Sequence, residues 1–128
     1  MSTTGDIAPV HHAIDYVEIA VTDIDAAKAF YSSAFGWSLV DYGPDYAGVQ
    51  GDGKEMGGLR RAAEVRAGGP LVILYSEDLE RSLEAVVAAG GTIVQPIEPF
   101  PGGRRFHFAD PAGNELAVWS DRGLDPSA

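Results

Sequence analysis

The fold is decided by the stretch Tyr16-Val-Glu-Ile-Ala-Val-Thr-Asp-Ile-Asp-Ala-Ala-Lys-Ala-Phe-Tyr-Ser-Ser-Ala-Phe-Gly36. Its order of features is repeated in a second stretch, Leu71-Val-Ile-Leu-Tyr-Ser-Glu-Asp-Leu-Glu-Arg-Ser-Leu-Glu-Ala-Val-Val-Ala-Ala-Gly-Gly91. An offset of 55 residues places Asp23 on Asp78 and Gly36 on Gly91. Few residues are identical, yet both stretches read as a strand, an acidic turn, a helix and a glycine stop. A repeat of this kind indicates one supersecondary unit that occurs twice.

Local signals define a strand and a helix in each half. The β-rich runs Ile14–Val21 and Leu71–Tyr75 are typical of strands. Asp23 and Asp78 then offer side-chain oxygens to the free N–H groups of a helix start. Apolar residues recur at helical spacing after each of them, and glycine, which readily adopts the left-handed conformation, follows the last turn. Each half is therefore predicted to begin with a strand and an amphipathic helix.

Three further strands are predicted to follow each helix, because β-rich runs alternate with turn residues. In the first half they are Trp37 to Tyr42, Tyr46 to Gln50 and Met56 to Arg61; in the second they are Thr92 to Ile97, Arg105 to Ala109 and Glu115 to Trp119. Residues 62–70 show neither the helical nor the strand spacing of apolar residues, and they end in two glycines and a proline. This composition predicts a linker. We expect one domain over residues 1–128, with modules at about 13–61 and 71–120 and a loose tail at 121–128.

The composition limits the class of protein. A chain of 128 residues is the size of one domain and can bury a core. The formal charge of −10 argues against a nucleic-acid partner, since phosphate binding needs an excess of Lys and Arg. The absence of cysteine excludes disulfides and a cysteine nucleophile. No apolar run approaches the roughly 18 residues of a membrane helix, and the first ten residues do not read as a signal peptide. We expect a soluble cytoplasmic protein with no membrane partner.

Three motifs become informative through their order and spacing. They are Asp23-Ile-Asp-Ala-Ala-Lys-Ala-Phe-Tyr31 running into Phe35-Gly-Trp37, then Ala88-Ala-Gly-Gly-Thr92, and then Asp110-Pro-Ala-Gly-Asn114. Together they resemble the vicinal oxygen chelate superfamily, also called the glyoxalase/bleomycin resistance protein/dioxygenase family, over about residues 13 to 120. The resemblance implies an α+β fold in which two tandem βαβββ modules form a curved mixed sheet around a cavity, with the helices outside. It also implies a homodimer.

The resemblance further implies a divalent metal, held by His and Glu side chains from the first and last strand of each module and acting as a Lewis acid. In this chain the four positions hold Tyr16, Gly57 or Gly58, Leu71 or Val72, and Ala117. None of these residues is His, Asp or Glu, and tyrosine alone is a poor ligand. We therefore expect no metal and no other cofactor.

Glu18 is the main candidate for chemistry in the first half. Strand alternation puts Tyr16 and Glu18 on one face of the first strand and three β-branched residues on the other. The β-branched face suits packing against a helix, so Glu18 is expected to point into the cavity. There it could act as a general base or hold a cationic or hydroxylated ligand. An ion pair with an arginine such as Arg104 or Arg105 is the other interpretation.

His107 is the corresponding candidate in the second half. It lies between Phe106 and Phe108 on a predicted strand, and a histidine can shuttle protons at neutral pH. The sequence does not fix the face that His107 occupies. Glu18 with His107 is the predicted acid–base pair, whereas Glu115, close to a turn, is predicted to be a rim charge.

Several aromatic and amide side chains are predicted to line the cavity. Trp119 offers a flat surface for stacking a ring or a cation, although filling the core is an equal interpretation. Tyr46 is a plausible wall residue, and in the alternative interpretation the tyrosines are sheet formers with hydroxyls in water. The predicted ligand-binding residues are Tyr16, Tyr42, Gln50, Tyr75 and Trp119.

Two functions of different classes follow from these residues. The first is a metal-independent module that binds a small organic molecule, aromatic or cationic in character. The second is a lyase, isomerase or epimerase that uses Glu18 as general base, with His107 or a tyrosine as acid. A metal-dependent glyoxalase or dioxygenase ranks third, because the residues at the ligand positions contradict it. The sequence does not name the ligand, since a fold does not carry a function by itself.

Overall fold

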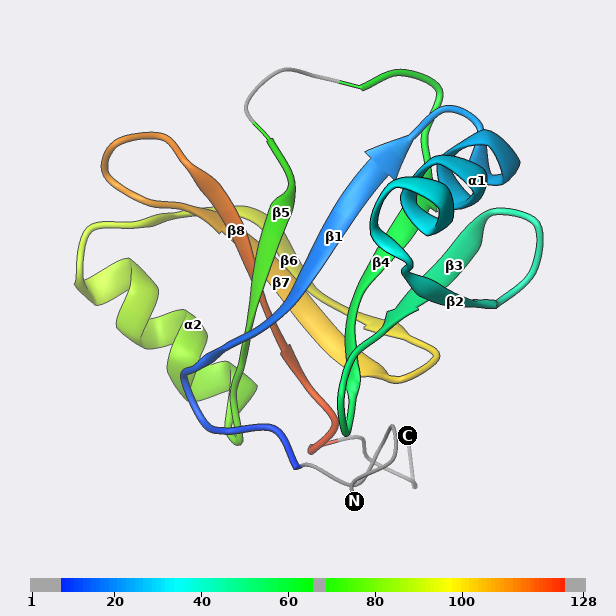
Figure 1. Ribbon diagram of the computed structural model, residues 1–128. Coiled ribbons are helices and arrows are strands. Elements are labelled where there is room, and N and C mark those ends of the chain that lie inside the picture. Colours follow the sequence, from blue (N-terminus) through cyan, green and yellow to red (C-terminus); the bar gives the residue numbers. More distant parts are fainter. Residues whose placement is uncertain (1–7, 66–68, 124–128) are drawn as a thin grey trace. The chain divides into compact units, whose positions relative to one another are not determined.

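The computed structural model describes residues 8–65 and 69–123. The chain divides into two compact units, one made chiefly of residues 16–70 and the other of residues 9–15 with 71 onward. Figure 1 shows a helix beside the strands of each unit. The predicted α+β class with two βαβββ modules is confirmed, whereas the cavity between curved sheets stays a prediction. No helix within the described ranges is long and apolar enough to cross a membrane.

The first unit contains one helix and four strands. They are β1 (Ile14–Val21), α1 (Ile24–Phe35), β2 (Ser38–Asp41), β3 (Tyr46–Gln50) and β4 (Glu55–Arg61). Within the unit the strand order is β2-β3-β4-β1. β1 and β4 are parallel, while β2, β3 and β4 pair antiparallel. The parallel pair requires a crossover, and α1 supplies it.

The ends of α1 follow the chemistry predicted for them. The Asp23 carboxylate accepts from the N–H of Ala26 at 3.0 Å, which satisfies one of the free donors of the first turn. Gly36 ends the helix with φ of 70°, and its N–H donates to the carbonyl of Ser32. Asp78 repeats this arrangement at the start of the second helix, where it accepts from the N–H of Arg81 at 3.1 Å.

The core of the first unit lies between α1 and one face of its sheet. Ile24 of α1 packs there with Ala47 and Leu59, both of which are completely buried. Ile19 and Val21 of β1 pack against the same cluster. Since successive strand residues face opposite sides, this packing commits Tyr16 and Glu18 to the face without a helix.

The second unit repeats the pattern. Its elements are β5 (Leu71–Tyr75), α2 (Leu79–Ala88), β6 (Thr92–Phe100), β7 (Gly103–Ala109) and β8 (Glu115–Ser120), and its strand order is β5-β8-β7-β6. β5 and β8 are parallel, and the other pairs are antiparallel. Leu79, Phe106 and Val118 form the buried centre of its core. Arg104 joins β7 to α2 through an ion pair with Glu80, and this pair lowers the pKa of the Glu80 carboxyl.

Residues 9–15 precede the first module along the chain but belong to the second unit. The N–H of His12 donates to the carbonyl of Tyr75 at 2.7 Å, and the N–H of Tyr75 donates to the carbonyl of Ala13 at 3.2 Å. The Nδ1 atom of His11 accepts from the N–H of Glu77 at 2.9 Å. The start of the described chain is therefore bonded to β5 and to the turn after it.

The strand limits differ from the prediction mainly at β6. The expected strand ended at Ile97, but β6 continues to Phe100 through Pro96 and Pro99. Proline lacks the N–H that an inner strand must donate, and β6 is the last strand in the order of its sheet. β7 also starts earlier than expected, at Gly103, because it pairs with the end of the longer β6. Parts of the predicted linker and tail, residues 66–68 and 124–128, lie outside the described residues.

Candidate functional site

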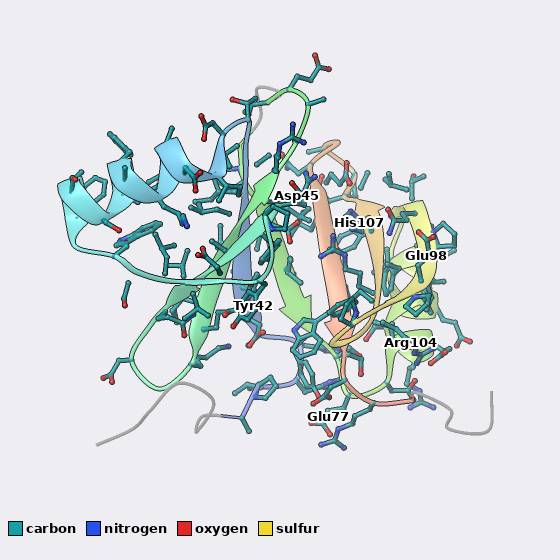
Figure 2. All side chains as sticks on the ribbon, turned by 90° about the vertical axis from the view of Figure 1, so that its right-hand side faces the viewer. Tyr42, Asp45, Glu77, Glu98, Arg104 and His107 are labelled. Atoms are coloured by element: carbon teal, nitrogen blue, oxygen red, sulfur yellow. The ribbon has the colours of Figure 1, made fainter. Side chains whose placement is uncertain are left out.

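The helix-free face of the first sheet carries a connected set of polar side chains, which we call the tyrosine–carboxylate network. Its members are Tyr16, Glu18, Tyr42, Tyr46, Gln50, Glu55 and Arg60. They come from β1, β3, β4 and the residue after β2. Tyr42, at one end of the network, is labelled in Figure 2.

Glu55 accepts three hydrogen bonds from side chains of the network. It accepts from the hydroxyl of Tyr16 at 2.8 Å, from the hydroxyl of Tyr42 at 2.7 Å, and from the amide of Gln50 at 3.1 Å. Hydrogen bonds to an ionised acceptor are stronger than those between neutral groups. These three donors hold the Glu55 carboxylate in one position on the sheet.

Glu18 occupies the buried end of the network. Its side chain is only 6 % exposed, and it accepts from the hydroxyl of Tyr46 at 3.0 Å. The guanidinium of Arg60 lies 3.3 Å from its other oxygen. A buried carboxylate needs such partners, because desolvation disfavours its charge. Glu18 thus forms the predicted ion pair with an arginine, but this arginine is Arg60 of the same unit. Arg104 pairs with Glu80 instead.

The tyrosines of the network stay protonated. Burial raises the pKa of Tyr16 far above its usual value, and its bonds to Tyr46 and Glu55 act in the same direction. Burial and the nearby Glu18 charge likewise raise the pKa of Tyr46, and the hydrogen bond to Glu55 raises that of Tyr42. Each hydroxyl therefore supplies one proton to the network across the physiological pH range.

Two glycines make room for the tyrosine rings on this face. A Cβ atom on Gly58 would lie 2.0 Å from the Tyr46 hydroxyl oxygen. A Cβ atom on Gly48 would lie 2.1 Å from the Glu55 carboxylate and 2.7 Å from the Tyr42 ring. Glycine in a strand interior often marks such a close approach. Because Gly48 and Gly58 have no side chain, the polar groups can lie against the sheet at these positions.

His107 lies on the helix-free side of the second sheet, since its neighbours Phe106 and Phe108 pack in the core with α2. Its Nδ1 atom lies 2.9 Å from the carboxylate of Glu115. Its Nε2 atom is buried and has no hydrogen-bond partner among the described residues. Glu115, predicted to be a rim charge, is an exposed carboxylate at the start of β8, and its contact with Nδ1 fixes the orientation of the imidazole ring. Figure 2 labels His107 with Arg104 in this unit.

Tyr75 and Trp119 meet in the second unit. Their rings are 5.2 Å apart in an edge-to-face arrangement, a favourable geometry for aromatic pairs. The hydroxyl of Tyr75 donates to Asp121, and the indole N–H of Trp119 donates to Asp15 at 3.0 Å. Trp119 also lies 6.2 Å from the ring of Phe100. Both predicted ligand-binding residues are thus fixed by acidic partners that the sequence did not indicate.

The side chains at the implied metal positions do not fit a metal ion. The hydroxyl of Tyr16 is taken up by Tyr46 and Glu55, and Ala117 is fully buried. The glycine and aliphatic positions offer no donor side chain. Across residues 8–65 and 69–123, no three His, Asp or Glu side chains converge as a metal site would require.

The structure brings some of the predicted site residues together. Tyr16, Glu18, Tyr42 and Gln50 share one network in the first unit, and Tyr75 contacts Trp119 in the second. Glu18 and His107 belong to different units, so their action as an acid–base pair stays a prediction. Glu55 was missed. The Gly51-Asp52-Gly53 turn indicated a hairpin there, but the pairing of Glu55 with Gln50 depends on a register shift between Val49 and Gln50.

Comparisons with known proteins agree on one family. A family model described as Glyoxalase/Bleomycin resistance protein/Dioxygenase superfamily matches residues 13–118. CFP32 of Mycobacterium bovis, which carries a glyoxylase name, is 26% identical over 82% of this chain. The "Anthracycline biosynthesis protein DnrV" of Streptomyces peucetius is 27% identical over 81% of it. These alignments cover 44% and 45% of the relatives, so the chain spans less than half their length.

A solved structure is similar to this chain and is also covered to less than half of its length. The Mn(II)-bound glyoxalase from Novosphingobium aromaticivorans matches with a TM-score of 0.65 and 29% identity. The match covers 94% of this chain and 44% of that protein.

Proposed function

Because the chain belongs to the glyoxalase/bleomycin resistance protein/dioxygenase superfamily, we propose that it binds a small organic molecule on its helix-free sheet faces without a metal. The expected ligand carries an aromatic ring and a positively charged or hydroxyl group. This proposal includes a homodimer in the cytoplasm. Two copies of the chain would together approach the length of one relative of the kind named above, since each relative is covered to less than half.

The observation that carries the proposal is a network of tyrosine hydroxyls and carboxylates at one of the positions for which the family resemblance implies a metal ligand. Where the family resemblance implies metal ligands, Tyr16 instead connects two carboxylates through hydroxyl groups. Such prepositioned acceptors can hold a cationic or hydroxylated group with little further ordering of side chains. The charge of −10 favours the approach of a cation over that of an anion.

Ligand binding is expected to be detectable with an anthracycline that carries an amino sugar, a probe suggested by the name of the Streptomyces relative. At a free concentration about 100 times the dissociation constant, such a probe stabilises the folded state by about 2.7 kcal/mol. We expect Glu55→Gln to weaken binding, measured by calorimetry, because it removes the charge at the centre of three hydrogen bonds. Glu84→Gln, on the exposed side of α2, serves as the control and should bind like the unaltered chain.

Metal dependence is tested on the same samples. The protein purified without chelators should contain no stoichiometric Mn, Zn, Ni or Fe, and EDTA should leave probe affinity unchanged. Turnover of the glutathione hemithioacetal of methylglyoxal that requires added Mn(II) would refute the metal-independent proposal. That outcome would favour the activity for which the Mn(II)-bound Novosphingobium glyoxalase is named.

A lyase, isomerase or epimerase activity is the second candidate, favoured by the buried carboxylate of Glu18 on the helix-free face. A general base must face its substrate in a fixed orientation, and Tyr46 and Arg60 fix this one. If Glu18 is a base, Glu18→Gln should abolish turnover of a substrate while leaving its affinity within about twofold. An equal loss of affinity and turnover would assign Glu18 to binding instead.

A further inference from the structure

Four oxygen atoms of the tyrosine–carboxylate network lie in an unbroken row. The carboxylate of Glu55 lies 2.8 Å from the hydroxyl of Tyr16, which lies 2.9 Å from the hydroxyl of Tyr46, which lies 3.0 Å from the carboxylate of Glu18. All three separations are within the range of O–H···O hydrogen bonds. The row runs from the partly exposed Glu55 to the buried Glu18.

The row is one proton short when both carboxylates are ionised. Its two tyrosine hydroxyls supply two protons, since burial raises the pKa of both groups, but three oxygen–oxygen contacts need three protons. With two protons, Tyr16 donates to Glu55 and Tyr46 donates to Glu18. The two phenol oxygens then face each other at 2.9 Å with no proton between them. A third proton on either carboxyl group would complete every contact.

We propose that Glu55, Tyr16, Tyr46 and Glu18 share one additional proton and form a relay between the two carboxylates. With the proton on Glu55, that carboxyl donates to Tyr16, Tyr16 donates to Tyr46, and Tyr46 donates to Glu18. Transfer of one proton across each contact in turn leaves both tyrosines neutral, deprotonates Glu55 and protonates Glu18. No other reactant is needed, and the net result is one proton moved from the partly exposed end to the buried end.

The surroundings of the row act on its two ends. Tyr42 and Gln50 donate to the second oxygen of Glu55, and the guanidinium of Arg60 lies beside Glu18. Both carboxylates thus have polar partners outside the row, so the two ends compete for the shared proton in similar surroundings. The relay is a property of the unliganded protein and goes beyond the proposed ligand binding. A failed ligand experiment therefore leaves it standing, and its own failure leaves ligand binding standing.

The test follows the carboxyl carbon of Glu18 by NMR through a pH titration, in protein labelled with ¹³C at glutamate. Glu55→Gln places an amide N–H donor at the far end of the row, which supplies the missing proton permanently. We expect this variant to lower the titration midpoint of Glu18 by about one pH unit. In the Tyr16→Phe background the hydroxyl contacts are broken while the charges stay in place, so Glu55→Gln should shift Glu18 by less than half as much.

Tyr42→Phe is the matched control, because it removes a hydroxyl donor to Glu55 but none of the three contacts of the row. In that background the full shift of Glu18 is expected. Amide NMR spectra identify each variant as folded before titration, and Tyr46→Phe provides a second break in the row if Tyr16→Phe does not fold. Equal shifts of Glu18 with and without the Tyr16 and Tyr46 hydroxyls would mean that the carboxylates interact only through space, and would overturn the relay.

Discussion

Phe106→Ala is expected to lower the free energy of unfolding by about 3–5 kcal/mol. Phe106 is completely buried between Leu79 and Val118, so its removal leaves a cavity that the surrounding strands and α2 can only partly fill. Stabilities of small proteins total about 5–15 kcal/mol, and the loss should therefore be large enough to unfold part of the population. Urea denaturation followed by circular dichroism measures it.

Val94→Ala is the control for this experiment. Val94 lies on β6 in the same unit and is 52% exposed, so its truncation should change stability by less than about 0.5 kcal/mol. A loss below about 1 kcal/mol for Phe106→Ala would contradict the assignment of this residue to the centre of the second core.

Gly57→Ala is expected to have the second-largest effect, a loss of about 3 kcal/mol from overpacking. A Cβ atom on Gly57 would lie 2.2 Å from the backbone carbonyl oxygen of Val17, its partner across the parallel β1–β4 pair. A backbone atom cannot rotate away as a side chain can, so the two strands must separate. Thermal and urea denaturation of the variant measure the loss.

The neighbouring Gly58→Ala variant is expected to disturb the tyrosine–carboxylate network more than the stability of the fold. Its added methyl group would meet the hydroxyl of Tyr46, the far end of a side chain that can turn aside. We expect a much smaller loss of stability than for Gly57→Ala, together with loss of the Tyr46 bonds to Tyr16 and Glu18. Similar stability losses for the two variants would show that Tyr46 is as immobile as the backbone.

The sequence predicts the elements whose causes are local. The caps at Asp23 and Asp78 and the stop at Gly36 depend on the few residues around them. The end of β6 could not be predicted in this way. Its prolines are tolerated because β6 is the last strand in the order of the described strands, and strand order is a tertiary property.

The sequence predicts the sheet face on which the site residues lie, but it does not predict their hydrogen-bond and ion-pair partners. The alternation of residue types in β1, with β-branched Val17, Ile19 and Val21 on one face, was enough to predict that Glu18 points to the other face. The contact of Glu55 with Gln50 depends on a register shift after Val49. The pairing of Glu18 with Arg60 depends on the register of two strands that are joined by a long crossover. Sequence periodicity contains neither register.

The placement of residues 9–15 affects the order in which the two units can fold during synthesis. This segment leaves the ribosome before residues 16–123, but its partners Tyr75 and Glu77 are made more than 60 residues later, and Trp119 bonds to Asp15 across 104 residues. The first unit has its own strands and core by residue 61. The second must wait until both ends of the described chain have been synthesised, so nascent chains stalled before Trp119 should expose the second unit to proteases longer than the first.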